Sequence, residues 1–386
     1  MATLLGALAF VVLILFAILF HEFGHYITAQ WAGIKASKFF IGFGPTLWSF
    51  RRGRTERYVD KDGAVRERPE TEYGVKLLPI GGFVKIVGMS PFEELAPEEE
   101  PRAFGAAPRW KRAIVLAAGS ATHFITAFLV MYVILVGVGI PDLNKPTRVI
   151  GTVAPEVAGD PSPASKAGLQ TGDRIAAIDG RPIDDWKRVQ EAIRNHPGRA
   201  LRLTVVRDAR TVNLTVTPAA DTQGGKTIGV IGVFPRSQTR RLNPVAAVGR
   251  TGIEMKNLVT SFFHTAPKAF SPTTLGLTGG KPSDQRPFSI LGAGRIAADL
   301  ASHGQIAIFL FLFVQINIFI AIFNMLPLPP LDGGHLLVLL IDKIRGRPVD
   351  QRALVPVMAV VFSILMLLAV LLVYYDIVSP VRIPVP

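Results

Sequence analysis

The sequence begins with a long uncharged segment that ends in two histidines and a glutamate. Residues 1–20 contain no Asp, Glu, Lys or Arg, and His21-Glu22-Phe23-Gly24-His25 follows directly. A segment of this length and composition can cross the hydrocarbon core of a bilayer. Ionisable side chains at its end are costly unless they are paired, bound to a metal or hydrated. This cost favours a functional site in a membrane protein over a pair of satisfied buried histidines.

The spacing of the two histidines predicts half of a metal site. On an α-helix, His21 and His25 project from one face, where two imidazoles can bind one Zn²⁺. Glu22 can then act on the water molecule bound to this ion. By amino-acid usage alone, a five-residue pattern of this kind occurs in roughly one chain in a hundred of this length. The motif therefore needs a third ligand and a suitable context.

The apolar residues lie in blocks, which predicts a polytopic α-helical membrane protein. Hydrophobic residues make up 49% of the 386 positions. Each of four uncharged segments is long enough to span a bilayer. These predicted spans are Ala2 to Phe20, Ala113 to Ile140, Gly304 to Leu331 and Ala353 to Tyr375. A cleaved signal peptide is the alternative for the first, but it has no basic residue before it and no obvious small-residue cleavage site after it.

The distribution of basic residues predicts the topology. Lys and Arg are frequent between residues 27 and 112, so by the positive-inside rule this part is cytoplasmic and the N-terminus lies outside. Residues 141–303 and the C-terminus are then outside as well. The net charge of +13 is scattered around the predicted spans, which fits anionic lipid headgroups better than nucleic acid. The absence of cysteine excludes disulfides and thiolate metal sites.

Residues 73–89 predict a β-hairpin in the cytoplasmic part. Two β-rich arms flank a turn at Gly81 and Gly82, followed by Phe83. We expect this hairpin to dip toward the membrane and to offer a strand edge to an unwound substrate. Residues 52–70 and 90–108 are rich in charge, proline and glycine, and predict loops.

Asp332 is the natural third ligand. It follows Pro327, Pro329 and Pro330 at the end of the third predicted span, on the same side of the membrane as His25. Two histidines and one carboxylate leave a fourth position open for water, as a catalytic zinc site requires. The alternative is that Asp332 and the two following glycines form only a helix-ending turn.

Residues 147–220 predict a small α+β domain outside the membrane. Strand, turn, strand, helix and strand patterns follow one another. The segment Ala167-Gly168-Leu169-x-x-Gly172-Asp173 resembles a PDZ domain, which typically takes an extended peptide at a strand edge. A purely structural module is the alternative. Residues 221–303 form a connector with an amphipathic stretch from Val245 to Phe263.

Together these motifs resemble the site-2 protease family, and more closely its bacterial RseP-like members with a single PDZ domain, as in actinobacteria. The resemblance rests on His21-Glu22-x-x-His25, the hairpin, the PDZ-like segment and Asn324-x-x-Pro-x-Pro-x-Leu-Asp332-Gly. It implies Zn²⁺ held by His21, His25 and Asp332, with Glu22 as catalytic acid and base and Asn324 in contact with substrate. It also implies cleavage of single-span membrane proteins, often anti-sigma factors already trimmed by an upstream site-1-type protease.

Two other histidines need an interpretation. His123 stands in the second span, where relatives commonly carry the Asn of a Gly-x-x-x-Asn pattern that begins here at Gly119. We expect it to hydrogen-bond within the helix bundle, with a contact to substrate or to a metal ligand as the alternative. His335 follows Asp332, but a fourth protein ligand would leave no place for water, so we interpret it as structural.

The sequence therefore predicts a multi-pass protein of the bacterial cytoplasmic membrane, an intramembrane zinc endopeptidase with an extracytoplasmic PDZ-like domain. The alternatives are a catalytically silent PDZ-bearing scaffold and a metal-dependent transporter. The expected parts are residues 1–140 with the zinc motif and hairpin, 147–220, 221–303, and 304–386 with the third ligand.

Overall fold

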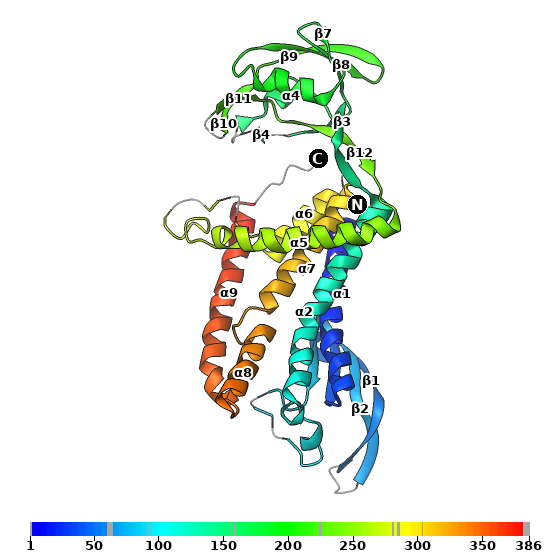
Figure 1. Cartoon of the computed structure of the whole chain (residues 1–386), viewed down its shortest axis with the longest axis vertical. Coiled ribbons are helices and arrows are strands. Elements are labelled where there is room, and N and C mark those ends of the chain that lie inside the picture. Colours follow the sequence, from blue (N-terminus) through cyan, green and yellow to red (C-terminus); the bar gives the residue numbers. More distant parts are fainter. Residues whose placement is uncertain are drawn as a thin grey trace. The chain divides into compact units, whose positions relative to one another are not determined.

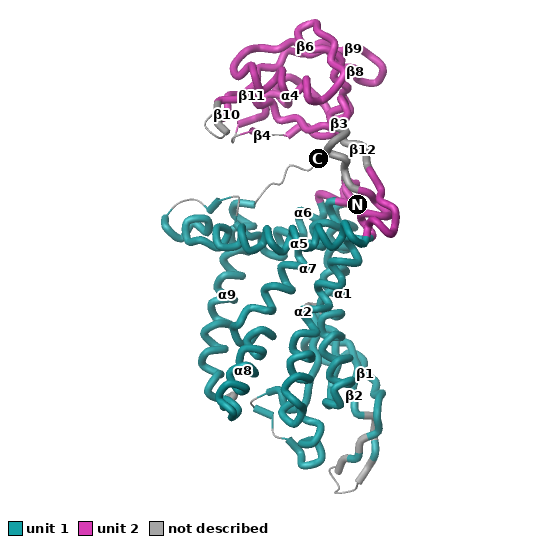
Figure 2. The backbone as a smooth tube through the Cα atoms, viewed as in Figure 1, with its two compact units in different colours: residues 1–132, 248–298, 308–381 teal, residues 133–247, 299–307, 382–386 magenta. Residues whose placement is uncertain are grey.

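The computed structural model contains two compact units, which Figure 2 distinguishes by colour. The first comprises residues 1–132, 248–298 and 308–381, and the second comprises 133–247, 299–307 and 382–386. The structure describes residues 2–59, 65–90, 92–93, 95–154, 156–157, 160–223, 226–279, 282–283, 286–302 and 304–380.

Four helices of the described residues are long and apolar enough to cross a membrane, which confirms the predicted number of spans. The spans are Thr3–Ala32, Arg109–Val138, Ile306–Asn324 and Arg352–Val378. The helices that form them are α1 (Ala2–Ala32), α2 (Arg109–Val133, continued by a π-helical segment Ile134–Val138), α7 (Ile306–Asn324) and α9 (Val355–Val378, preceded by the 3-10 turn Gln351–Leu354). Figure 1 shows all four helices, with α8 (Asp332–Arg345) after α7.

Helix α1 continues twelve residues beyond the predicted end of the first span at Phe20, since it ends at Ala32. The residues after Phe20 contain no proline, and no glycine except Gly24 until Gly33 ends the helix in a left-handed conformation. Buried side chains recur along α1 every three or four residues, which places them on one face. They include Phe10, Ile14, Ala17, His21, His25 and Ala29. The two histidines therefore lie inside a helix and on its packed face.

The segment between α7 and α8 positions Asp332. Helix α7 ends at Asn324, and the prolines that follow cannot continue a helix. Helix α8 then begins at Asp332 itself, so this residue starts a helix and does not end one. A Cβ on Gly333 or Gly334 would overlap the backbone of the proline-rich segment. Only glycine permits this close return of the chain.

The segment predicted to be cytoplasmic forms a long β-hairpin of β1 (Ala36–Val59) and β2 (Val65–Ile86). Residues 38–41 pair on one edge with 82–85 and on the other with 72–75. The two predicted arms therefore flank a segment of β1, whereas the predicted hairpin paired them with each other. Residues 52–59 and 65–70, predicted as loop, are strand.

Exposed apolar side chains gather near one end of this hairpin. Trp48 is 61% exposed, and its neighbours in the strands are also exposed although apolar. These neighbours are Phe43, Leu47, Phe50, Leu77 and Leu78. The other end carries exposed charges, such as the ion pair of Arg57 with Glu67 at 2.9 Å. The hairpin is thus amphipathic along its length.

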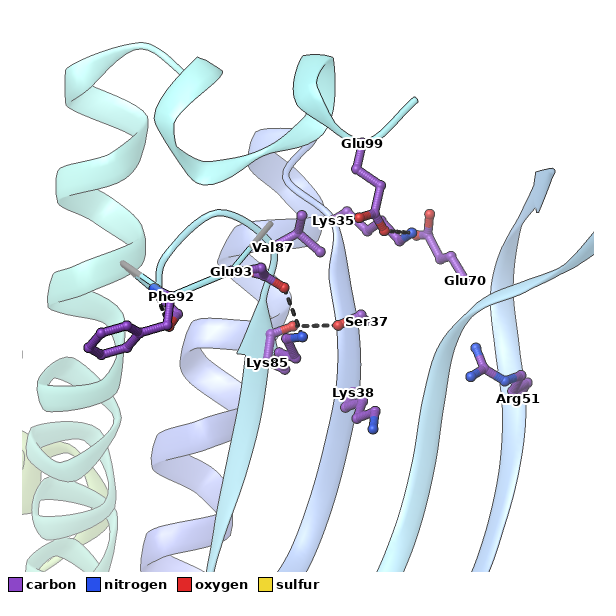
Figure 3. Close-up of a pocket in the computed structure, with 11 residues that line it drawn as sticks. Lys35, Ser37, Lys38, Arg51, Glu70, Lys85, Val87, Phe92, Glu93 and Glu99 are labelled. Carbon is purple, nitrogen blue, oxygen red and sulfur yellow. Dashed lines mark hydrogen bonds and ion pairs between the residues drawn. The ribbon is translucent and has the colours of Figure 1, made fainter. Parts of the chain in front are cut away.

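Paired charges fix the base of the hairpin (Figure 3). Lys35 Nζ lies 2.5 Å from Glu99 Oε1, and Lys85 Nζ lies 2.8 Å from Glu93 Oε1. The Lys35 carbonyl also accepts a hydrogen bond from Val87 N–H at 3.0 Å. The residues that make these contacts line a polar pocket of about 490 Å³ at the end of α1. They hold the strand edge at residues 82–86 in a fixed position beside that helix.

The last span is held at its end by a buried ion pair. All of α9 is described, and only Leu372 and Asp376 in it are buried. Arg286 Nη1 donates to Asp376 Oδ1 at 2.7 Å, with the two side chains 1% and 2% exposed. Asp376 Oδ2 accepts from Ser289 N–H at 2.6 Å, just before α6 (Ile290–Ser302).

Helix α5 (Pro244–Ala269) covers the predicted amphipathic stretch and runs across the direction of α7 and α9 (Figure 1).

The second unit is an α+β domain. Its sheet has the order β12-β3-β6-β8-β9, so it extends beyond the predicted end at residue 220. The strands of this sheet are β3 (Ile140–Val153), β6 (Arg174–Ile178), β7 (Arg181–Pro182, beside β6), β8 (Leu201–Arg207), β9 (Arg210–Val216) and β12 (Val233–Arg240). Two separate two-stranded sheets are formed by β4 (Glu156–Val157) and β5 (Asp160–Pro161), and by β10 (Ala219–Gln223) and β11 (Lys226–Val230). The helices are α3 (Pro163–Lys166) and α4 (Trp186–Arg194).

Asp173 connects the segment at Gln170 with strand β8 through hydrogen bonds. Arg207 binds its two carboxylate oxygens at 2.7 and 2.8 Å, and Gln170 N–H donates to it at 2.9 Å. Burial of the carboxyl opposes its ionisation, but these hydrogen bonds outweigh burial and hold the pKa of Asp173 below its usual value. Asp173 of the predicted PDZ-like motif therefore has a structural role.

The ion pair of α9 yields a test of stability. We expect Asp376→Leu to destabilise the protein by about 3–5 kcal/mol, because it leaves the Arg286 charge buried without its partner. The double variant Arg286→Leu/Asp376→Leu should recover part of this loss, since no unpaired charge remains. Thermal unfolding of the detergent-solubilised proteins measures both. Equal destabilisation by the single and double variants would contradict this account.

Candidate metal centre

The structure brings three predicted ligands together. Nε2 of His21 and Nε2 of His25 lie 3.2 Å apart, and Asp332 Oδ2 lies 3.5 Å from the first and 3.4 Å from the second. The donor atoms of a tetrahedral zinc site with bonds of about 2.0–2.1 Å are separated by about 3.3 Å. The three atoms therefore already stand at the spacing of three corners of such a tetrahedron.

The hydrogen bonds around these atoms also fit a metal. His25 Nδ1 donates to the Val115 carbonyl at 2.8 Å, which leaves its Nε2 free to bind. Asp332 Oδ2 is buried and makes no hydrogen bond with the described residues. A buried carboxylate oxygen and two imidazole nitrogens in close contact are unfavourable as they stand. A cation between them would satisfy all three.

Gly119 on α2 provides the space beside the histidines. A Cβ at this position would overlap His25 Nε2, and it would lie 2.7 Å from His21 Nε2 and 2.5 Å from His21 Cε1. No side chain larger than hydrogen fits there. The glycine that begins the predicted Gly-x-x-x-Asn pattern thus keeps the metal-facing nitrogens accessible.

Glu22 lies beside this cluster and contacts the hairpin. Its Oε2 accepts a hydrogen bond from Val84 N–H of β2 at 2.9 Å. Successive residues of a strand direct their N–H groups to opposite edges, so Gly82, two positions before Val84, shares its edge. A Cβ on Gly82 would lie 3.7 Å from Glu22 Cγ, which also places Gly82 next to Glu22. The predicted base and the predicted strand edge are therefore adjacent.

The other predicted site residues lie in α7, β2, α8 and α2. Asn324 is half-buried at the end of α7, while Gly81 and Phe83 are half-buried in β2. His335 lies in the first turn of α8, and neither it nor His123 belongs to the group of ligand atoms found among the described residues. His123 is buried in α2, and its Nδ1 lies 2.9 Å from Asn317 Oδ1 of α7.

Four contacts of the centre were not predicted. Val84, Val115 and Asn317 act through hydrogen bonds between distant segments, and no local pattern marks them. Gly119 had a signal in its spacing from His123, but only the helix packing shows that its missing Cβ matters.

The packing at Gly119 yields a test. We expect Gly119→Ala to abolish tight metal binding while α2 remains helical, because alanine favours a helix but its Cβ occupies the space of the ligand nitrogens. Metal content after purification, with circular dichroism as a measure of folding, tests this. Gly137→Ala is the matched control, since a Cβ there meets no atom closer than 4.0 Å. Full metal occupancy in Gly119→Ala would contradict the proposed position of the metal.

Comparisons with known proteins identify the family. The model of peptidase family M50 matches residues 9–59 and 64–368. The chain is 33% identical to zinc metalloprotease Rip1 of Mycolicibacterium smegmatis, over 98% of each chain. It is 27% identical to zinc metalloprotease RasP of Geobacillus kaustophilus, over 97% of this chain and 98% of the relative. It is 28% identical to the regulator of sigma E protease of Salmonella typhi, over 89% and 92% respectively. The chain therefore belongs to peptidase family M50, the site-2 protease family that its motifs indicated.

Proposed function

We propose that this protein is an intramembrane zinc endopeptidase that cleaves single-span membrane proteins in regulated proteolysis. Family membership and the named relatives support a zinc metalloprotease, as predicted. The observation that carries the proposal is the meeting of His21, His25 and Asp332 at zinc-ligand spacing, with Glu22 next to them. Three protein ligands leave one position for water, which distinguishes a catalytic from a structural site.

In this proposal Nε2 of His21, Nε2 of His25 and Oδ2 of Asp332 hold the zinc. When bound, zinc lowers the pKa of a water molecule toward neutrality and polarises the peptide carbonyl. The Glu22 carboxylate takes the proton of the attacking water and later gives it to the leaving amine nitrogen. The Val84 N–H fixes the orientation of this carboxylate. Asn324 is proposed to contact the substrate near the scissile bond, where its amide can stabilise negative charge on the oxygen.

A helical substrate must unwind before cleavage, because its carbonyls are engaged in its own hydrogen bonds. We propose that the unwound segment pairs with the edge of β2, where Gly81, Gly82 and Phe83 lie beside Val84. The apolar end of the hairpin supports this role, since Phe43, Leu47 and Trp48 are exposed and suited to a membrane environment. Pairing at this edge would place a substrate peptide bond close to Glu22.

We propose the bacterial cytoplasmic membrane as the location, with the hairpin on the cytoplasmic side and residues 147–220 outside. The apolar spans and the basic residues between the first two support this topology. One relative is named a regulator of sigma E protease, which supports anti-sigma factors as substrates. An upstream site-1-type protease as a partner belongs to the same proposal and rests on the family resemblance alone. The PDZ-like domain would restrict access of substrates with large outer domains, while residues 221–303 connect it to the second membrane half.

Two other classes make different demands on the site. A transporter needs polar groups along a path through the membrane, whereas the predicted ligands gather at one place. A catalytically silent scaffold does not need a carboxylate between the two histidines. Glu22 beside the cluster therefore favours the protease.

Two substitutions separate the roles of the carboxylates. We expect Glu22→Gln to keep one metal ion per chain and to lower cleavage by about 10²–10⁴-fold, because Glu22 moves protons but does not bind the metal. Asp332→Ala should lose metal as well as activity. Metal analysis and cleavage of a labelled single-span substrate in the same detergent test both. Undiminished turnover in purified Glu22→Gln would overturn the mechanism, and full occupancy in folded Asp332→Ala would overturn the ligand assignment.

The strand edge can be tested at Val84. Val84→Pro removes the N–H that faces Glu22, and proline is tolerated at an outward-facing edge position. We expect kcat/KM to fall by about 10-fold or more, since a hydrogen bond to a charged group is lost, while metal content is unchanged. Val84→Ala is the matched control, because it keeps the N–H. Equal activity of the two variants would show that this edge does not contribute.

A further inference from the structure

The second nitrogen of His21 needs a hydrogen-bond acceptor. If Nε2 of His21 binds the metal, as proposed above, then Nδ1 of the neutral ring carries the proton. Metal-binding histidines usually donate this N–H to a carboxylate, a carbonyl or water, and His25 does so to Val115. His21 Nδ1 is buried and has no hydrogen-bond partner among the described residues. The ring of a histidine ligand is not held in a fixed orientation unless a neighbouring group accepts this N–H.

The backbone acceptor beside the His21 ring is the Gly119 carbonyl, and it is already engaged. The Gly119 carbonyl accepts a hydrogen bond from Thr122 Oγ1 at 2.7 Å. In the regular pattern of α2 it also accepts the backbone N–H of the residue four positions later. A carbonyl oxygen has two lone pairs, so neither remains for His21.

His123 has a free acceptor close to His21. Asn317 Nδ2 donates to the Phe313 carbonyl at 2.9 Å, so its Oδ1 is the atom that faces His123. An amide oxygen only accepts, and His123 Nδ1, at 2.9 Å, must therefore carry the proton. In the neutral ring this leaves a lone pair on Nε2. The His123 side chain is among the largest that are fully buried, and the residue is only 2% exposed.

The two rings stand at a suitable separation. The centroids of His21 and His123 lie 5.1 Å apart, with 40° between the ring planes. A separation of about 5 Å is expected when one imidazole donates an N–H to a nitrogen of the other at about 3 Å.

We propose that His123 Nε2 accepts the Nδ1 proton of His21 and orients this metal ligand. The resulting series of hydrogen bonds, called the relay below, runs from His21 through His123 and Asn317 to the Phe313 carbonyl. Each of these three side chains donates to the next acceptor in the series. His123 and Asn317 are thus positioning residues that act through His21. This inference rests on the proposed metal site, and it gives a role to the histidine found where the family pattern has asparagine.

Three substitutions of His123 test the proposal. In His123→Gln the side-chain amide lies at about the position of Nε2, toward His21. In His123→Asn the amide lies at about the position of Nδ1, toward Asn317. His123→Leu provides no hydrogen-bonding group at either position. We expect His123→Leu and His123→Asn to weaken zinc affinity by about 10–100-fold, the usual effect of losing such a partner, and His123→Gln to restore most of it. Chelator competition measures the affinity of the purified full-length protein.

Cobalt substitution provides a second measurement that a purely structural role would not change. The Co²⁺ absorption bands should shift in the Leu and Asn variants and return toward the wild-type positions in the Gln variant, because they report ligand geometry. Thr126→Val is the matched control, a buried substitution one turn further along α2. Thermal unfolding of each metal-free protein checks folding.

The outcomes separate the relay from the proposed function. Wild-type affinity and spectrum in His123→Leu would overturn the relay while the metal site stands. Rescue by Asn but not by Gln would also overturn it, because His123 would then act only by joining α2 to α7. A wild-type protein that binds neither Zn²⁺ nor Co²⁺ would overturn the proposed metal site, and the relay with it.

Discussion

The structure depends on three donor atoms that meet within 3.5 Å although they come from opposite ends of the chain. Two imidazole nitrogens and a carboxylate oxygen at this spacing are tolerable in an apolar environment only when a cation shares them. The surrounding packing serves this meeting. Gly119 leaves space for the nitrogens, and the close backbone return at Gly333 and Gly334 allows Asp332 to begin α8.

Several polar groups among the spans have a partner on a different helix or strand. His25 donates to α2, Glu22 accepts from β2, and His123 pairs with Asn317 of α7. Arg286 and Asp376 join the segment before α6 to the end of α9 in the same way. In a membrane, where apolar surfaces gain little from association with each other, such bonds specify which helices pack together.

The sequence identified the parts of the site whose signal is local. His21, Glu22 and His25 share one helical turn, and Asp332 stands beside prolines that break a span, so spacing and apolar context predicted them as the candidate site. The partners of these residues were not predictable, because His123 and Asn317 are 194 positions apart and their pairing depends on helix packing. The charged residues 52–70 were predicted as loop, yet most of them form strands, since a two-stranded ribbon satisfies its backbone while its side chains remain hydrated.

The distribution of the ligands along the chain has a consequence for biogenesis. His21 and His25 are synthesised first, but Asp332 follows 307 positions after His25. A nascent or truncated chain that lacks α8 holds only two of the three donor atoms. Such a chain would be inert toward the neighbouring membrane proteins among which it inserts. The late position of one carboxylate thus delays hydrolytic competence until both membrane halves have been assembled.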